Sequence, residues 1–467
     1  MKNIYSLLIV FGILFSACDS YFDVELYQNI PNEDAYKSVS DVENAMNGAY
    51  YALGTYRFHG RDIVALGDIA SDLALAGAES GHMVTINAYT FSETDADLSD
   101  MWTFGYQVID RATRTINGAK ALLAAGNLSD DNQETLNSVI SQCYALKAYA
   151  AFVLVNIYGF PYGTNDDAHG GIVVIKDQPK EATETVSRSS VKATYEQILS
   201  DIENAKATPN SGYGQFYFNN AAIYALEARV NLFMKNYGVA ATAAQNAINA
   251  RGGQGVSNDD YVKMWQAIAI TGEDIFTIPK TNDDNLSANS LNTLYSTYKS
   301  KMTDALVKLF QPNDIRMKLL DTVKGANHPK KYDGIAGAAA VSNIPVFRVS
   351  EMYLIIAEAK ANTDANLDEA KTALLFTAKR NPAITTIADL NYNKEDLLKF
   401  ISEERCREFF AEGHRWYAAR RTGEKINAYD GKYANFDVAK FLYPIPSTEI
   451  NAGFGTEQND WVNTLPQ

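Results

Sequence analysis

The chain has 467 residues, of which 46% are hydrophobic and 21% are charged, and its formal net charge is −15 at pH 7. This composition is typical of a globular protein that is long enough to bury one or two large cores. The acidic balance, without clusters of Lys and Arg, argues against a nucleic-acid-binding protein, because such clusters are what bind phosphate backbones.

Residues 1–17 have the features of an export signal. One early Lys precedes an apolar run that ends at Phe15, and this run is too short to span a membrane as a helix. Two small residues lie directly before Cys18. This pattern resembles a bacterial lipoprotein precursor and predicts cleavage before Cys18 and lipidation of its thiol. The alternative is an ordinary signal peptide with a Cys there by chance. The mature chain is expected to be a single domain, 18–467.

Residues 32–53 predict a pair of helices, with Asn32 and Ser40 as candidate N-caps. A short turn follows at 54–59. Residues 77–97 are then long, polar and without helical periodicity. Long irregular stretches in compact proteins are often binding loops, so this region is a candidate for ligand contact.

Helical periodicity returns at Leu98, continues in a long helix at 130–158, and reveals an internal repeat. The sequence YALKA at 144–148 has a second copy, YALEA, at 224–228, and after an apolar stretch each copy is followed by Asn, Tyr and Gly. Each copy predicts part of a helix–turn–helix unit that must stack on another unit to bury its apolar face. A weaker third unit covers 350–380.

These units are similar to tetratricopeptide-type hairpins, although the copies are scattered rather than in tandem. We therefore predict a mainly α fold, in which tetratricopeptide-like helical hairpins form a scaffold with loop-rich excursions and a few short strands. Two strand-like pieces lie at 170–175 and 274–279. The excursions from the scaffold cover about 54–97, 159–190 and 252–345.

The stretch 397–421 predicts one helix that carries charge at core positions. Its apolar stripe, continued in steps of three and four residues, reaches three glutamates and an arginine instead of apolar residues. A buried charge that loses its partner costs about 3–5 kcal/mol, so these residues need ion pairs. Arginines of the same helix are the obvious partners, for example Arg415 for Glu412. The predicted structural ion network consists of Glu404, Arg405, Glu408, Glu412 and Arg415.

An alternative interpretation makes Glu404 and Glu408 the two catalytic carboxylates of a helical glycoside hydrolase, one acid and one base or nucleophile. Side chains one helical turn apart point in the same direction, whereas a glycosidase needs carboxylates on both sides of the scissile bond. The spacing therefore favours the structural role.

No cofactor or metal site is predicted. The five His residues form no HxxxH-type pair, which argues against a zinc site. Asp68 and Asp72 lie four residues apart, but such an isolated pair more often caps a helix or faces solvent than binds a metal. Cys143 and Cys406 both fall in helical patterns, where small buried hydrophobes are expected, although an exported protein could pair them.

A series of short motifs, in this order along nearly the whole mature chain, resembles the SusD-like (RagB/SusD) nutrient-binding outer-membrane lipoproteins of Bacteroidetes. The order of the pieces is the specific feature, since no single piece decides the matter. The chain departs from the family pattern at Ala418, where members commonly carry an acidic residue. The matching pieces include Gly67-Asp68, Tyr158–Pro161, Asp314–Arg316, Ile344–Arg348, Glu404-Arg405 with Glu408 and Glu412-Gly413, Arg420-Arg421 and Tyr443–Pro446.

The resemblance implies a binding protein without catalytic activity or cofactor. Members of this family lie on the cell surface at the outer membrane, anchored through lipid, which here would be on Cys18. They cover a SusC-like TonB-dependent transporter and capture oligosaccharide, or in some members peptide, for import. By this account the glutamates of 397–421 are structural. A transporter lid without its own ligand site is a further alternative.

Aromatic side chains in the excursions are the candidate ligand contacts, because a ring can stack on the apolar face of a sugar while nearby polar groups bind its hydroxyls. The chain has 28 Tyr and 21 Phe, and core packing accounts for most of them. Packing is also the alternative for each candidate, above all for Trp265 in its apolar run. The predicted ligand-binding residues are Tyr56, His82, Tyr89, Trp265, Tyr295 and Tyr298.

Overall fold

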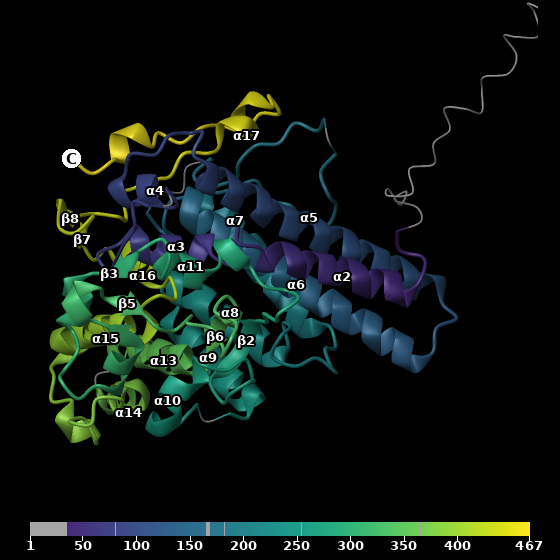
Figure 1. Cartoon of the computed structure of the whole chain (residues 1–467). Coiled ribbons are helices and arrows are strands. Elements are labelled where there is room, and N and C mark those ends of the chain that lie inside the picture. Colours follow the sequence, from purple (N-terminus) through teal and green to yellow (C-terminus); the bar gives the residue numbers. More distant parts are fainter. Residues whose placement is uncertain (1–34, 80, 165–168, 182, 254, 364–365) are drawn as a thin grey trace, which may run out of the picture.

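The computed structural model describes residues 35–467 except 80, 165–168, 182, 254 and 364–365. The predicted export signal, the lipidation site Cys18 and the candidate cap Asn32 lie outside the described residues. Within them the chain is mainly helical, with long helices side by side and four two-stranded sheets (Figure 1). The predicted mainly α fold is confirmed.

Long helices from the first half of the chain lie side by side in Figure 1, and each packs against the next one in chain order. Each begins at a Ser or Asp whose side chain accepts a hydrogen bond from a backbone N–H of the first turn. The cap of the first is Ser38, which forms a capping box with Asp41, so the prediction of Ser40 was wrong by two residues. The helices are α2 (Val39–Gly54), α5 (Ala96–Ala125), α6 (Asp130–Tyr158) and α7 (Val191–Ala207).

Helix α6 passes through the centre of the fold. It is long and apolar enough to span a membrane, but 94% of its most apolar window is buried inside the protein. The repeat sequence at 144–148 lies in this helix, and its small and apolar residues face neighbours on several sides. The apolar character of α6 therefore reflects core packing.

The predicted hairpins of the second and third repeat units are formed. Helix α8 (Asn220–Phe233) pairs with α9 (Tyr237–Arg251), and α13 (Val349–Thr363) pairs with α14 (Asp368–Ala378). Helix α9 also packs on α13, so the two hairpins stack. The buried side of α9 is mostly Ala, and small side chains let helices approach closely.

The strands form only short antiparallel pairs. The predicted strand at 274–279 is present as β2, whereas the described residues of 170–175 form no strand. The pairs are β1 (Ala74–Leu75) with β3 (Lys301–Met302), β2 (Asp274–Ile278) with β6 (Ile344–Arg348), β4 (Leu320–Asp321) with β5 (His328–Pro329), and β7 (Ile426–Ala428) with β8 (Tyr433–Phe436).

Short helices occupy much of the excursions. They are α3 (Asp62–Ile69), α4 (Val84–Ala88), α10 (Asn258–Met264), α11 (Leu291–Tyr295), α12 (Asp304–Val307) and α17 (Ser447–Asn451), together with the 3₁₀ helices η1 (Ser287–Asn289), η2 (Ile315–Leu319), η3 (Val323–Gly325), η4 (Ile387–Asp389) and η5 (Val462–Thr464).

The predicted single helix at 397–421 is two helices, α15 (Lys394–Phe409) and α16 (Arg415–Thr422). Ala411 and Gly413 between them have positive φ angles of 62° and 78°, which interrupt the helical path. The break brings the backbone of Gly413 against Gly67 of α3, where a Cβ would lie 1.9 Å from the Gly413 carbonyl oxygen. Close backbone packing between distant segments therefore overrides a good local helix pattern.

Candidate functional site

Three of the six aromatic candidates are buried in the hydrophobic core. Tyr89, Trp265 and Tyr295 are only 4%, 5% and 2% exposed. The hydroxyl of Tyr89 donates a hydrogen bond to the carbonyl oxygen of Ala70, and its ring packs edge-on against Phe441. These three side chains present no free ring face to a ligand, so the expectation that they stack on sugar does not fit the structure.

The Tyr89→Ala variant is expected to lose about 3–5 kcal/mol of its free energy of unfolding, as other large aromatic side chains do when they are deleted from cores. Urea unfolding followed by circular dichroism measures the loss. Tyr51→Ala is the matched control, because Tyr51 is 71% exposed, and we expect it to leave the unfolding midpoint unchanged. If Tyr89→Ala were as stable as the wild type but bound glycan more weakly, Tyr89 would be a ligand-binding residue after all.

The other three candidates are partly exposed and lie near one another. The rings of His82 and Tyr298 are 5.6 Å apart between centroids. The guanidinium groups of Arg57 and Arg61 lie over the ring of Tyr56, at 4.7 and 4.8 Å from its centroid. His82 directly precedes Met83, whose backbone N–H donates to Asp97, and the Asp97 carboxylate lies 3.9 Å from Arg61, so these groups share one neighbourhood. We call Tyr56, Arg57, His82 and Tyr298 the aromatic patch.

Arg61 ties together the segments that carry the patch. Its guanidinium is buried, binds the Asp62 carboxylate at 2.6 Å and donates to Oδ1 of Asn289 at 3.3 Å. It also lies 3.9 Å from the carboxylate of Asp97, which accepts a hydrogen bond from the backbone N–H of Met83. The excursions at 54–97 and 252–345 therefore meet at this arginine.

Polar groups flank the rings of the patch. Arg57 forms an ion pair of 3.0 Å with Asp100, and both side chains remain more than a third exposed. The Arg57 guanidinium also lies 5.3 Å from the ring centroid of Phe104. Partly exposed rings beside charged donors and acceptors can bind a ligand that has apolar faces and a hydroxyl rim.

The glutamates of α15 lie in an ion network that solvent does not reach. Glu404 accepts a hydrogen bond from Arg316 at 2.7 Å, and Glu408 binds Arg316, Arg348 and Arg380 at 3.2, 3.0 and 3.0 Å. Burial alone would raise the pKa of Glu408, but these three cations lower it to about 2. A glycosidase needs one carboxyl group with a raised pKa beside space for the sugar. Neither glutamate meets this requirement.

Most partners in this network come from other parts of the chain. Glu412 binds Lys331 and Arg348, whereas Arg415, predicted as its partner, binds Asp72 at 2.8 Å. In the part of the chain that the structure describes, Arg405 has no ion-pair partner. Local spacing on one helix could not identify these distant partners. A signal was present, because Asp314–Arg316 and Ile344–Arg348 were among the motifs that carried the family resemblance.

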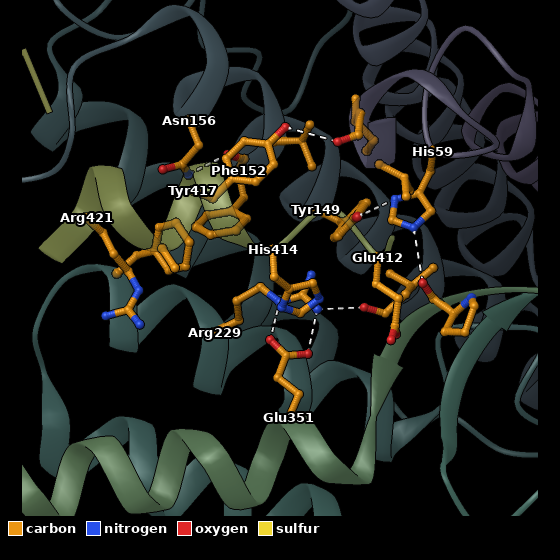
Figure 2. Close-up of a pocket in the computed structure, with 18 of the residues that line it drawn as sticks. His59, Tyr149, Phe152, Asn156, Arg229, Glu351, Glu412, His414, Tyr417 and Arg421 are labelled. Atoms are coloured by element: carbon orange, nitrogen blue, oxygen red, sulfur yellow. Dashed lines mark hydrogen bonds and ion pairs between the residues drawn. The ribbon is translucent and has the colours of Figure 1, made fainter. Parts of the chain in front are cut away.

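A cavity of about 70 Å³ lies inside the fold, between α6, α8, β6 and the break before α16 (Figure 2). Its wall contains the Arg229–Glu351 ion pair and the hydrogen bond of 2.7 Å between Tyr149 and His59. Burial lowers the pKa of His59 to about 3, so its ring is neutral. The cavity is too small for a sugar ring and is separate from the aromatic patch.

Among the residues the structure describes, no cluster of three or more His, Cys, Asp or Glu could hold a metal ion. Asp68 accepts a hydrogen bond of 3.0 Å from the backbone N–H of Gly413, and Asp72 binds Arg415, so both have structural partners. Within the described part of the chain, Cys143 and Cys406 are buried and form no disulfide.

Two family models match the chain. One, described as "Starch-binding associating with outer membrane", matches residues 20–232, and one described as "SusD family" matches residues 188–461. "SusD-like protein P2" of Formosa agariphila is 25% identical over 481 aligned positions, which cover 90% of this chain and 91% of that protein.

Solved structures share the fold. A "putative sugar binding protein" from Bacteroides vulgatus superposes with a TM-score of 0.81 at 25% identity, over 91% of this chain and 99% of that one. A SusD superfamily protein from Bacteroides thetaiotaomicron superposes with a TM-score of 0.80 at 24% identity, over 90% of this chain and 99% of that one.

Proposed function

This chain belongs to the SusD family, and on that premise we propose that it is a glycan-binding lipoprotein of the outer-membrane surface that passes oligosaccharide to a SusC-like TonB-dependent transporter. Lipid on Cys18 would anchor it, and residues 18–467 would form the single binding domain. The family description of starch binding at the outer membrane and the lipoprotein-like pattern of 1–18 support this proposal.

The aromatic patch is the observation that carries the proposal. It combines two adjacent, partly exposed rings, those of His82 and Tyr298, with a third ring at Tyr56 and a partly exposed guanidinium at Arg57. Flat rings suit the apolar faces of pyranose units, and a guanidinium donates to hydroxyl oxygens. The predicted ligand residues are thereby reduced to Tyr56, His82 and Tyr298.

Removing the rings of the patch is expected to weaken glycan binding without loss of stability. Each ring that stacks on a sugar contributes about 0.5–1.5 kcal/mol, so Tyr298→Ala should raise Kd roughly threefold to tenfold, and the double variant with Tyr56→Ala should raise it further. Titration calorimetry with maltooligosaccharides, after an array that covers other glycans and peptides, measures this. Tyr51→Ala, an exposed tyrosine on α2, is the control.

Two results, one from the calorimetry and one from the array, would contradict this assignment. Equal affinity of wild type and the double variant would place the glycan elsewhere on the protein. Retention of peptides alone, or of no ligand at all, would favour a peptide-binding member or a transporter lid without its own site.

The proposed function is ligand binding without catalysis. The buried, ion-paired state of Glu404 and Glu408 argues against the glycoside hydrolase alternative. Pure protein incubated for a long period with polysaccharides is expected to release no reducing ends. A rate of release that disappears in Glu404→Gln would contradict this view.

A further inference from the structure

Arg405 of α15 is a buried cation that forms no ion pair with any residue the structure describes. Its side chain is 7% exposed, and its Nε and Nη1 atoms are buried without a hydrogen-bond partner among the described residues. The ring of Phe409, 5.7 Å from the guanidinium carbon, supplies only a weak cation–π contact. An uncompensated buried charge is strongly destabilising, so a negative group is needed nearby.

The carboxylates that act most strongly on the charge of Arg405 already form ion pairs with other arginines. Glu358 binds both terminal nitrogens of Arg421 at 2.6 Å, and Glu351 binds Arg229 at 2.6 and 2.7 Å. Each of these pairs is neutral overall, so Arg405 remains as an extra positive charge. Burial, followed by the positive charges of Arg229 and Arg405, lowers the pKa of His414, whose ring is therefore neutral and provides no compensation either.

Space for a counter-ion is present beside Arg405. This side chain lines the cavity of about 70 Å³ shown in Figure 2, together with His414, Tyr417 and Ala418. A cavity of that size holds a few water-sized species. Arg405, Ala418 and Arg421 also line a surface groove of about 600 Å³. The groove and the cavity therefore lie on either side of the same residues, so the site is close to the protein surface.

We propose that this cavity is a binding site for a small monovalent anion of the chloride class, held by the guanidinium of Arg405. The anion supplies the negative charge that no described side chain gives to Arg405. It thereby stabilises the packing of α15 on α16 around the break between them. This site is independent of the aromatic patch and of the proposed glycan.

Chloride is expected to stabilise the wild-type protein against thermal unfolding, and the Ala418→Asp variant is expected to lose this response. The midpoint should rise with the logarithm of chloride concentration over about 3–300 mM, with sodium gluconate holding the ionic strength constant, because a ligand that binds only the folded state stabilises by RT ln(1 + [L]/Kd). Ala418→Asp places a carboxylate at the cavity, so its midpoint should be higher without chloride and independent of it.

Two further variants separate the site from general salt effects. Ala121→Asp adds the same charge on an exposed position of α5 and should respond to chloride as wild type does. Arg405→Met removes the cation and should not respond. An equal chloride response in wild type and Ala418→Asp, or the absence of any response in wild type, would overturn the proposal.

Bromide provides a measurement that does not depend on how well the variants fold. Wild-type crystals soaked in sodium bromide should show an anomalous difference peak in the cavity beside Arg405, and Arg405→Met crystals should show none there. A cavity that contains only water after the soak would overturn the proposal.

Discussion

The Glu408→Gln variant is expected to lose about 3–5 kcal/mol of its free energy of unfolding, which is the cost of removing one partner from a buried ion pair. Glu408 is fully buried and accepts hydrogen bonds from Arg316, Arg348 and Arg380, and also from the hydroxyl of Tyr261 at 3.0 Å. Glutamine keeps the shape but removes the charge that three guanidinium groups share. Urea unfolding at pH 7 measures the loss.

An exposed ion pair provides the control for this variant. Asp260 lies 2.8 Å from Lys263, and both side chains are more than half exposed. Asp260→Asn removes the same charge where water screens it, so the unfolding midpoint should not change. If Glu408→Gln were as stable as Asp260→Asn, the network would not hold the α15 region in place.

The stability of the protein at acid pH should depend on the same carboxylate, that of Glu408. The pKa of Glu408 falls from its ordinary 4.5 to about 2 in the folded protein, because three arginines outweigh the effect of burial. A carboxylate with a lowered pKa contributes its full stabilisation above the ordinary pKa, and loses it as the pH falls towards the folded value. Below about pH 4.5 the wild type should therefore lose stability more steeply than Glu408→Gln. Parallel curves would contradict this assignment.

The Gly67→Ala variant is expected to lose about 4 kcal/mol or more, or to fail to fold. A Cβ at Gly67 would lie 1.9 Å from the carbonyl oxygen and 2.4 Å from the carbonyl carbon of Gly413, so two backbone segments would have to separate. Flexible side chains can move aside, but α3 and the loop before α16 cannot move independently, because Asp68 accepts a hydrogen bond from the Gly413 N–H. The yield of soluble protein and the thermal midpoint measure the effect.

Gly48→Ala is the matched control in another helix. Apart from the backbone of its own helix and its chain neighbours, no described atom lies within 4 Å of the position of its added Cβ, and alanine is the better helix former. This variant should gain about 0.4–1 kcal/mol. A Gly67→Ala protein with wild-type stability would show that α3 and α16 do not approach as closely as the structure indicates.

The sequence by itself determined the scaffold. Helical periodicity and capping residues depend on neighbours three or four positions away, and these local patterns predicted the whole of α6 and the hairpins α8–α9 and α13–α14. The order of short motifs also indicated the family, because that order is a property of the chain. The mainly α fold was therefore predictable without knowledge of any distant contact.

Tertiary structure alone decided which loop aromatics remain exposed. Tyr89 lies in a polar stretch, but it is buried because its ring packs against Phe436 and Phe441, which lie about 350 positions later in the chain. His82 and Tyr298 form a patch because two separate excursions meet. Burial of a ring depends on what the fold places over it, and no local pattern contains that information.

The region of α15 and α16 contains features that the sequence predicted and features that only the tertiary structure decided. Its charged positions predicted a buried ion network, which followed from the helical period alone. The break at Gly413 and the pairing of Arg415 with Asp72 depend on how α3 packs against α16. That Arg405 has no ion-pair partner among the described residues follows from the fold as well, because the nearby carboxylates of Glu351 and Glu358 bind other arginines. Local interactions are encoded in neighbouring residues, whereas the partner of a buried charge is set by whichever distant segment the packed core brings beside it.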